Sequence, residues 1–127
     1  MKSIVFLSNN RKKALLSQFC DAYKPILSKY EIFATFGTSQ IIKQHGLSVY
    51  SFLSGIVGGY RQVISKIYCN EVDLLLFFRD SSRFHVDSLS KLESEVLTAC
   101  DFCNVPSATN VLTAEILLRA LDSGSFF

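Results

Sequence analysis

Apolar residues follow two alternating patterns along this chain. Short continuous runs with β-branched members predict buried strands, and apolar residues spaced three and four apart predict helices with one buried face. The predicted strands cover residues 3–7, 31–35, 47–53, 73–78 and 106–109. The predicted helical faces comprise Leu15, Leu16, Phe19, Cys20 and Tyr23; Ile41 and Ile42; Val63, Ile64 and Ile67; Leu92, Val96, Ala99, Cys100 and Cys103; and Leu112, Ile116 and Leu117.

Strands that alternate with helices, and that are apolar on both faces, are typical of a parallel sheet covered on both sides. We therefore predict an α/β fold, a three-layer sandwich around a mostly parallel five-stranded sheet. The chain has 127 residues, enough for a single domain over residues 1–127 and too few for two. In such sheets ligands bind at the carboxyl ends of the strands.

The composition limits which partners and ligands we expect for this chain. Hydrophobic residues make up 49% of the chain, a surplus that favours a homo-oligomer, and a net charge of +2 gives no reason to expect nucleic acid. The longest apolar runs, residues 4–7 and 74–78, are too short to cross a membrane, so we expect a cytoplasmic protein with free thiols. Cys100 and Cys103 form a C-x-x-C pair without a second pair, so we expect no metal and no cofactor.

Hydroxyls, glycines and basic residues recur just after the predicted strands. Backbone N–H groups at helix N-termini bind anions, and phosphate in particular, although serine, threonine and asparagine also cap helices for structural reasons. Several such turns at one edge of a sheet predict a phosphate site. The segments are Ser8-Asn9-Asn10-Arg11-Lys12-Lys13, Thr35-Phe36-Gly37-Thr38-Ser39, Ser54-Gly55, Gly58-Gly59-Tyr60-Arg61, Arg79-Asp80 and Ala108-Thr109-Asn110.

Four of these regions, in order, resemble methylglyoxal synthase and its relatives. They read IFATFGTSQ (32–40), LSGIVGGYRQV (53–63), VDLLLFFRD (72–80) and VPSATNVLTAE (105–115). The resemblance implies a Rossmann-like sheet and, from the family enzymes, a hexamer. Those enzymes convert dihydroxyacetone phosphate to methylglyoxal and phosphate through an enediolate. Other members of the wider family bind phosphorylated metabolites or nucleotides.

The resemblance assigns a phosphate-binding role to Lys13, Thr35 and Thr38, with Gly37 in place of a third threonine. The glycine-rich stretch and Asp80 also match the family pattern. Together with neighbouring strand-end residues, the predicted ligand-binding set is Asn9, Asn10, Lys13, Thr35, Gly37, Thr38, Ser54, Gly55, Gly58, Gly59, Tyr60 and Arg61.

The catalytic half of the pattern departs from the family. Tyr60 stands where the enzymes have their catalytic aspartate, and Asn9 and Asn10 stand where they have a histidine and another aspartate. A tyrosine, with a pKa near ~10, is a poor base at neutral pH. We therefore expect a non-catalytic protein that binds a phosphorylated small molecule, most simply a nucleotide or nucleotide-derived signal.

Two other functions stay open. One is a lyase with a rearranged site, in which Asp80 acts as the base and His85 and Asp87, at altered spacing, take part. The other is a scaffold that has kept only the fold. Tyr60 itself has two interpretations: it extends the buried helical stripe of Val63, Ile64 and Ile67, or it stacks on a flat ligand beside Arg61.

Overall fold

A computed structural model describes residues 2–81 and 88–124 of the chain. Its centre is a five-stranded sheet in the order β3-β2-β1-β4-β5, in which every neighbouring pair is parallel. The predicted α/β fold with a five-stranded sheet is thereby confirmed. The strands are β1 (Ser3–Ser8), β2 (Glu31–Ala34), β3 (Tyr50–Ser51), β4 (Leu74–Phe78) and β5 (Ser107–Ala108).

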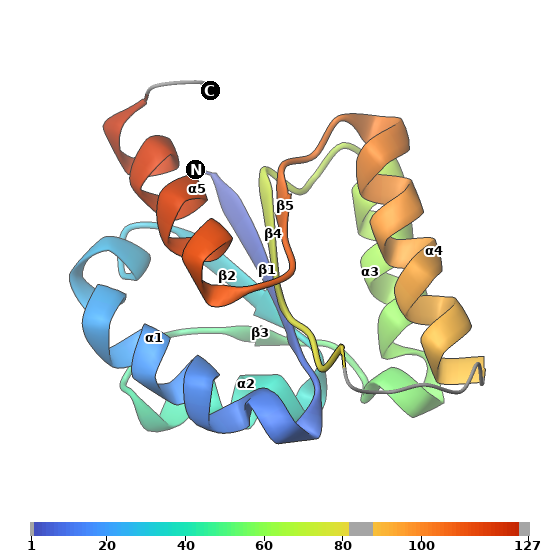
Figure 1. The fold of residues 1–127 in the computed structure, drawn as a ribbon, viewed down its shortest axis with the longest axis horizontal. Coiled ribbons are helices and arrows are strands. Elements are labelled where there is room, and N and C mark those ends of the chain that lie inside the picture. The colour runs from blue at the N-terminus through green and yellow to red at the C-terminus, as the bar shows by residue number, and fades with distance from the viewer. Residues whose placement is uncertain (1, 82–87, 125–127) are drawn as a thin grey trace.

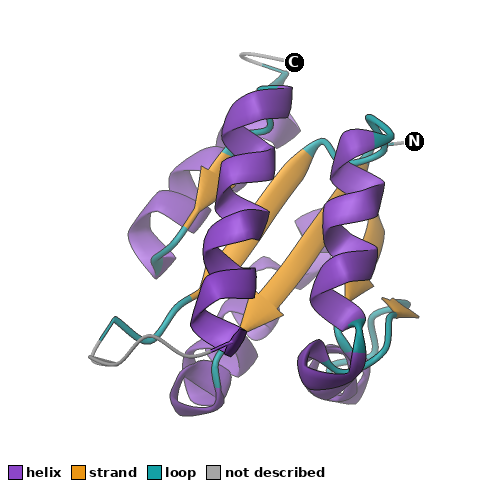
Figure 2. Cartoon of the chain, turned by 90° about the vertical axis from the view of Figure 1, so that its right-hand side faces the viewer, coloured by secondary structure: helices purple, strands orange, loops and turns teal. Residues whose placement is uncertain are grey.

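Helices cover both faces of the sheet (Figures 1 and 2). One face packs against α1, α2 and α5, and the opposite face packs against α3 and α4. Two short 3₁₀ helices, η1 and η2, precede α1 and α3. The bounds are η1 (Asn10–Lys12), α1 (Lys13–Leu27), α2 (Phe36–Gln44), η2 (Gly55–Val57), α3 (Gly59–Tyr68), α4 (Ser88–Cys103) and α5 (Val111–Ser123).

The two central strands are buried along their whole length, as their apolar sequences predict. Successive side chains of a strand point to opposite faces, so β1 serves two cores. Ile4 and Phe6 pack in the core beneath α1 and α5, and Val5 and Leu7 pack in the core beneath α3 and α4. This burial fixes the carboxyl ends of β1 and β4 side by side, with Ser8 paired to Phe78.

Two sequence predictions about the elements need correction. The strand predicted over residues 47–53 is only Tyr50–Ser51, an exposed pair at the edge of the sheet. In α5, Leu112 and Ile116 are 58% and 65% exposed, and the buried positions are instead Ala114, Leu118 and Leu121. Because α5 carries apolar residues around most of its circumference, spacing alone did not decide which stripe faces the sheet.

His85 and Asp87 lie outside the described residues. Within the described residues, no helix is both long and apolar enough to span a bilayer. All four cysteines are free thiols, as the sequence predicts.

Candidate functional site

A lysine and three hydroxyl side chains meet where β1 and β2 end. The Nζ of Lys13 donates to the Ser8 hydroxyl at 2.8 Å, to the Thr38 hydroxyl at 3.1 Å and to the Ser8 carbonyl at 3.3 Å. The Ser8 and Thr38 hydroxyl oxygens lie 3.0 Å apart, and Thr35 donates to Thr38 over 3.4 Å. We call Ser8, Lys13, Thr35 and Thr38 the Lys13 cluster. Burial of the ammonium group lowers the pKa of Lys13.

The N-terminus of α2 points into this cluster. Thr35 is the N-cap residue, yet its side chain makes no capping hydrogen bond and turns to Thr38 instead. A Cβ atom on Gly37 would lie 3.7 Å from the Lys13 Nζ, so the first turn of α2 lies directly against the ammonium group. A helix N-terminus next to a cation is a setting that suits phosphate. The Thr35 side chain therefore does not cap α2, although a capping role is the usual structural reason for a threonine at this position.

The loop from Ser54 to Gly59 lies next to the α2 N-terminus, because Phe36 N donates to Leu53 O over 3.4 Å. Gly58 has a φ of +113°, a conformation that favours glycine. A Cβ on Gly59 would lie 2.1 Å from Leu53 O, so this backbone approach admits no side chain. The backbone geometry of this turn thus favours glycine at positions 58 and 59 whether or not a ligand binds there.

Tyr60 points into the core beneath α3 and α4. Its side chain is 5% exposed, and its ring lies 6.4 Å from that of Phe77. A Cβ on Gly55 would come within 2.7 Å of the Tyr60 ring, so this glycine makes room for the tyrosine. The buried ring leaves no exposed face for a ligand, and the stacking interpretation is contradicted.

Asn9, at the end of β1, connects Glu93 of α4 with the backbone of Asp80, which follows β4. Asn9, 7% exposed, donates from Nδ2 to Glu93 Oε2 at 2.7 Å and accepts from the Asp80 backbone N–H at 2.7 Å. The Tyr60 hydroxyl donates to the same Glu93 oxygen at 3.3 Å. The Asp80 side chain is 10% exposed, and Arg11 Nε lies 3.9 Å from its Oδ2. The Asp80 carboxyl group thus follows β4, whose end pairs with Ser8 of the Lys13 cluster.

Other predicted site residues lie outside these contacts. Asn10 begins η1 and Arg61 lies in the first turn of α3, and both are exposed. Ser54 is half-buried at the N-cap of η2.

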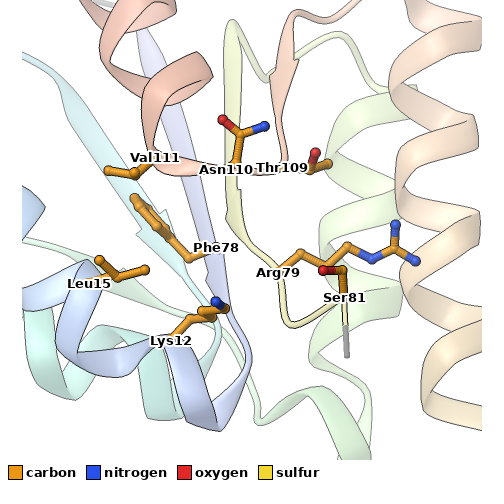
Figure 3. Close-up of a pocket in the computed structure, with 8 residues that line it drawn as sticks. All are labelled: Lys12, Leu15, Phe78, Arg79, Ser81, Thr109, Asn110 and Val111. Atoms are coloured by element: carbon orange, nitrogen blue, oxygen red, sulfur yellow. The ribbon is translucent and has the colours of Figure 1, made fainter. Parts of the chain in front are cut away.

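A pocket of about 400 Å³ opens beside the site, between the first turns of α1 and α5. Figure 3 shows Leu15, Phe78 and Val111 on one side of it and Arg79 and Ser81 on the other. Among the residues described there, the lining includes no carboxylate and no histidine. The pocket shares no residue with the Lys13 cluster.

Comparison with known proteins now assigns a family. Residues 16–109 match the MGS-like domain family. The chain belongs to this family. It is 41% identical over 125 residues to the methylglyoxal synthase of Caldicellulosiruptor saccharolyticus, covering 96% of this chain and 86% of that protein. It is 39% identical over 126 residues to the methylglyoxal synthase of Geobacillus sp., covering 97% and 87%.

A solved structure agrees with this membership of the MGS-like family. The crystal structure of methylglyoxal synthase from Elizabethkingia anophelis superposes with a TM-score of 0.81 at 27% identity, covering 92% of this chain and 76% of that one. The prediction of a non-catalytic binding protein is wrong, because similarity to methylglyoxal synthases over nearly the whole chain supports a catalytic protein. The prediction rested on Tyr60, Asn9 and Asn10 in place of the family's catalytic residues, and the similarity over nearly the whole chain favours the alternative of a lyase with a rearranged site.

Sequence reasoning missed two residues of the site. Ser8 ends β1 and was noted only as part of a strand-end segment, yet its hydroxyl accepts from Lys13. Glu93 is fully buried on α4. A signal for it exists in the sequence: Glu93 precedes Val96 by three residues and Cys100 by seven, which puts a carboxyl group on the apolar face of that helix.

Proposed function

We propose that this protein is a lyase that converts dihydroxyacetone phosphate to methylglyoxal and inorganic phosphate. The observation that carries this proposal is the 39–41% identity to methylglyoxal synthases over at least 96% of the chain. The Lys13 cluster supports it, because a phosphorylated substrate needs a cation and hydrogen-bond donors at one point.

In the proposed complex the phosphate lies at the α2 N-terminus. Lys13 supplies the positive charge, and the hydroxyls of Ser8 and Thr38, already 2.8 and 3.1 Å from the Lys13 Nζ, can turn their protons toward phosphate oxygens. Gly37 lies against the ammonium group, where a Cβ atom would be 3.7 Å from the Lys13 Nζ. The substrate carbons then extend toward the end of β4.

We assign the role of base to Asp80. It lies at the carboxyl end of β4, next to Asn9, and its side chain reaches solvent, whereas Glu93 is fully buried and Tyr60 is a poor base. The Asp80 carboxylate takes a proton from the hydroxymethyl carbon, and the C–H electron pair forms the C=C bond of an enediolate phosphate. Collapse of the enediolate breaks the C–O bond to phosphate, which leaves with that electron pair, and the resulting enol tautomerises to methylglyoxal.

A direct assay tests the proposed function. Purified protein incubated with dihydroxyacetone phosphate is expected to release methylglyoxal and phosphate in equal amounts, with a kcat within about a hundredfold of an ordinary enzyme's ~10 s⁻¹. Methylglyoxal is trapped and measured spectroscopically, and phosphate is measured separately. Release at no more than the uncatalysed rate would refute the proposal.

Replacing Lys13 with methionine is expected to raise KM for dihydroxyacetone phosphate by about 10–100-fold. Methionine keeps the length and packing of the side chain but removes the charge. The loss of a hydrogen bond to a charged group is worth about 1.5–3 kcal/mol. Steady-state kinetics on the two proteins measure the change.

The pH dependence of KM is the control for this variant. The pKa of Lys13 is lowered by burial, so the ammonium group loses its proton at a lower pH than an exposed lysine does. KM of the unmodified protein should therefore rise toward alkaline pH, because the uncharged amine attracts phosphate less. In Lys13→Met this rise should be absent. If the dependence of KM on pH is the same in Lys13→Met as in the unmodified protein, Lys13 does not belong to the phosphate site.

A homo-oligomer, with a hexamer favoured by the family resemblance, stays a prediction. Exposed apolar side chains at Phe36, Tyr50, Leu53 and Val57, which are 53–64% exposed, support it. Sedimentation at micromolar protein concentration decides between an oligomer and a monomer.

A further inference from the structure

Glu93 is an unusual residue in this fold. It is 0% exposed on α4, and it is the only aspartate, glutamate, lysine or arginine that is buried among the residues described. Glutamate is almost never fully buried unless it is paired, since removing a carboxyl group from water carries a large free-energy cost. The groups that hydrogen-bond to Glu93 therefore indicate its role.

Two hydrogen-bond partners of Glu93 are described, Asn9 and Tyr60, and both lie near the carboxyl ends of the strands. Asn9 Nδ2 donates to Glu93 Oε2 at 2.7 Å, and the Tyr60 hydroxyl donates to the same oxygen at 3.3 Å. The shorter contact is the stronger one, since 3.3 Å lies beyond the usual range for an O–H donor. Of these two contacts, the one to Asn9 is therefore the stronger.

The Asn9 amide is fixed from both ends. Its Nδ2 faces the Glu93 carboxyl oxygen, and its Oδ1 accepts from the Asp80 backbone N–H at 2.7 Å. Rotating the amide by 180° would set an oxygen against Glu93 and an NH₂ group against the Asp80 N–H. That orientation would lose both hydrogen bonds and create two repulsive contacts. Glu93 thus holds Asn9 in the only orientation that accepts from Asp80.

We propose that Glu93 is a positioning residue for the lyase reaction, acting through Asn9 on the Asp80 backbone. The inference depends on the proposed function, in which Asp80 is the base. Asn9 also donates its own backbone N–H to Phe78 O at 3.1 Å, so β1 and β4 are joined at this point twice. Loss of the Glu93 contact leaves the Asn9 amide held from one end only, by the Asp80 N–H, so its orientation is less firmly fixed.

The first test is Glu93→Met, which keeps the length of the side chain and leaves no oxygen to accept from Asn9. We expect kcat to fall by about 10–100-fold, the scale of a misplacement of about 1 Å at a reacting group, with KM changed less than about threefold. Glu95→Met, an exposed position on the same helix, is the matched control and should keep full activity. A kcat for Glu93→Met within about threefold of the unmodified protein would overturn the proposal.

A conservative variant distinguishes positioning from general loss of structure. Glu93→Gln keeps a side-chain oxygen that can accept from Asn9 Nδ2, whereas Glu93→Met does not. We expect kcat of Glu93→Gln to be at least about tenfold higher than that of Glu93→Met. Equal values of kcat in the two folded variants would overturn the proposal.

A readout independent of activity separates this inference from the proposed function. Hydrogen exchange of the Asp80 amide, followed by NMR, should be about tenfold faster in Glu93→Met and also in Asn9→Ala, which breaks the same link from its other end. The Asn9→Ala arm serves even if the Glu93 variant does not fold. Unchanged exchange in Asn9→Ala refutes the link whatever the activity, while faster exchange in a protein without lyase activity refutes only the proposed reaction.

Discussion

Replacing Asp80 with asparagine is expected to lower kcat for methylglyoxal formation by about 10²–10⁴-fold, the usual contribution of a positioned general base. The amide has almost the same shape as the carboxylate but cannot accept the proton from the substrate carbon. Asp80 keeps a partly exposed side chain and a backbone hydrogen bond that does not involve its carboxylate. Folding should therefore change little, and steady-state kinetics with a thermal melt measures both quantities.

Asp101 supplies the matched control for this change. It is an exposed aspartate on α4, and Asp101→Asn should leave both kcat and the melting temperature close to those of the unmodified protein. If Asp80→Asn keeps kcat within about threefold of the original value, Asp80 is not the base. The proton acceptor would then have to be sought in another residue.

Tyr60→Ala is expected to lower the free energy of unfolding by about 3–5 kcal/mol, as other truncations of large buried aromatic residues do. The ring is 5% exposed, packs near Phe77 and lies directly over Gly55, so its removal leaves a cavity in the core beneath α3 and α4. Urea denaturation measured at constant pH gives the change.

Two further variants assign that loss to the ring. Tyr60→Phe keeps the ring and removes only the hydroxyl contact to Glu93, so it should cost no more than about 1.5 kcal/mol. Tyr68→Ala removes a tyrosine that is 49% exposed on the same helix and should cost less than about 1 kcal/mol. A loss below about 1 kcal/mol for Tyr60→Ala would contradict the buried position of the ring.

The fold could be predicted from the sequence where burial is complete and periodic. β1 and β4 are continuous apolar runs that the structure buries on both faces, and their neighbours carry clear helical spacing. The prediction failed where local pattern does not decide the outcome. β3 pairs over only two residues, since an edge strand has a single neighbouring strand. In α5, apolar residues lie on more than one side of the helix.

The residues of the candidate site likewise include some that the sequence could predict and some that it could not. The convergence of strand ends in a parallel sheet predicts that the segments holding Lys13, Thr35 and Thr38 lie together, and the family resemblance singles out these three residues. Glu93 could not be assigned to the site, because its contact with Asn9 spans 84 residues of sequence and depends on how α4 lies against the sheet. Tyr60 was ambiguous for a related reason: only the surrounding ring and glycine contacts distinguish a core residue from a ligand platform.

The contact between Tyr60 and Glu93 also restricts the mutational paths open to this sequence. A single change that returned position 60 to the aspartate of the family enzymes would bring a second acid toward the buried Glu93 oxygen and leave the space beside Phe77 unfilled. Removing Glu93 first would take away the principal acceptor of Asn9. We therefore expect positions 60 and 93 to be epistatic: the effect of a substitution at either position depends on which residue occupies the other.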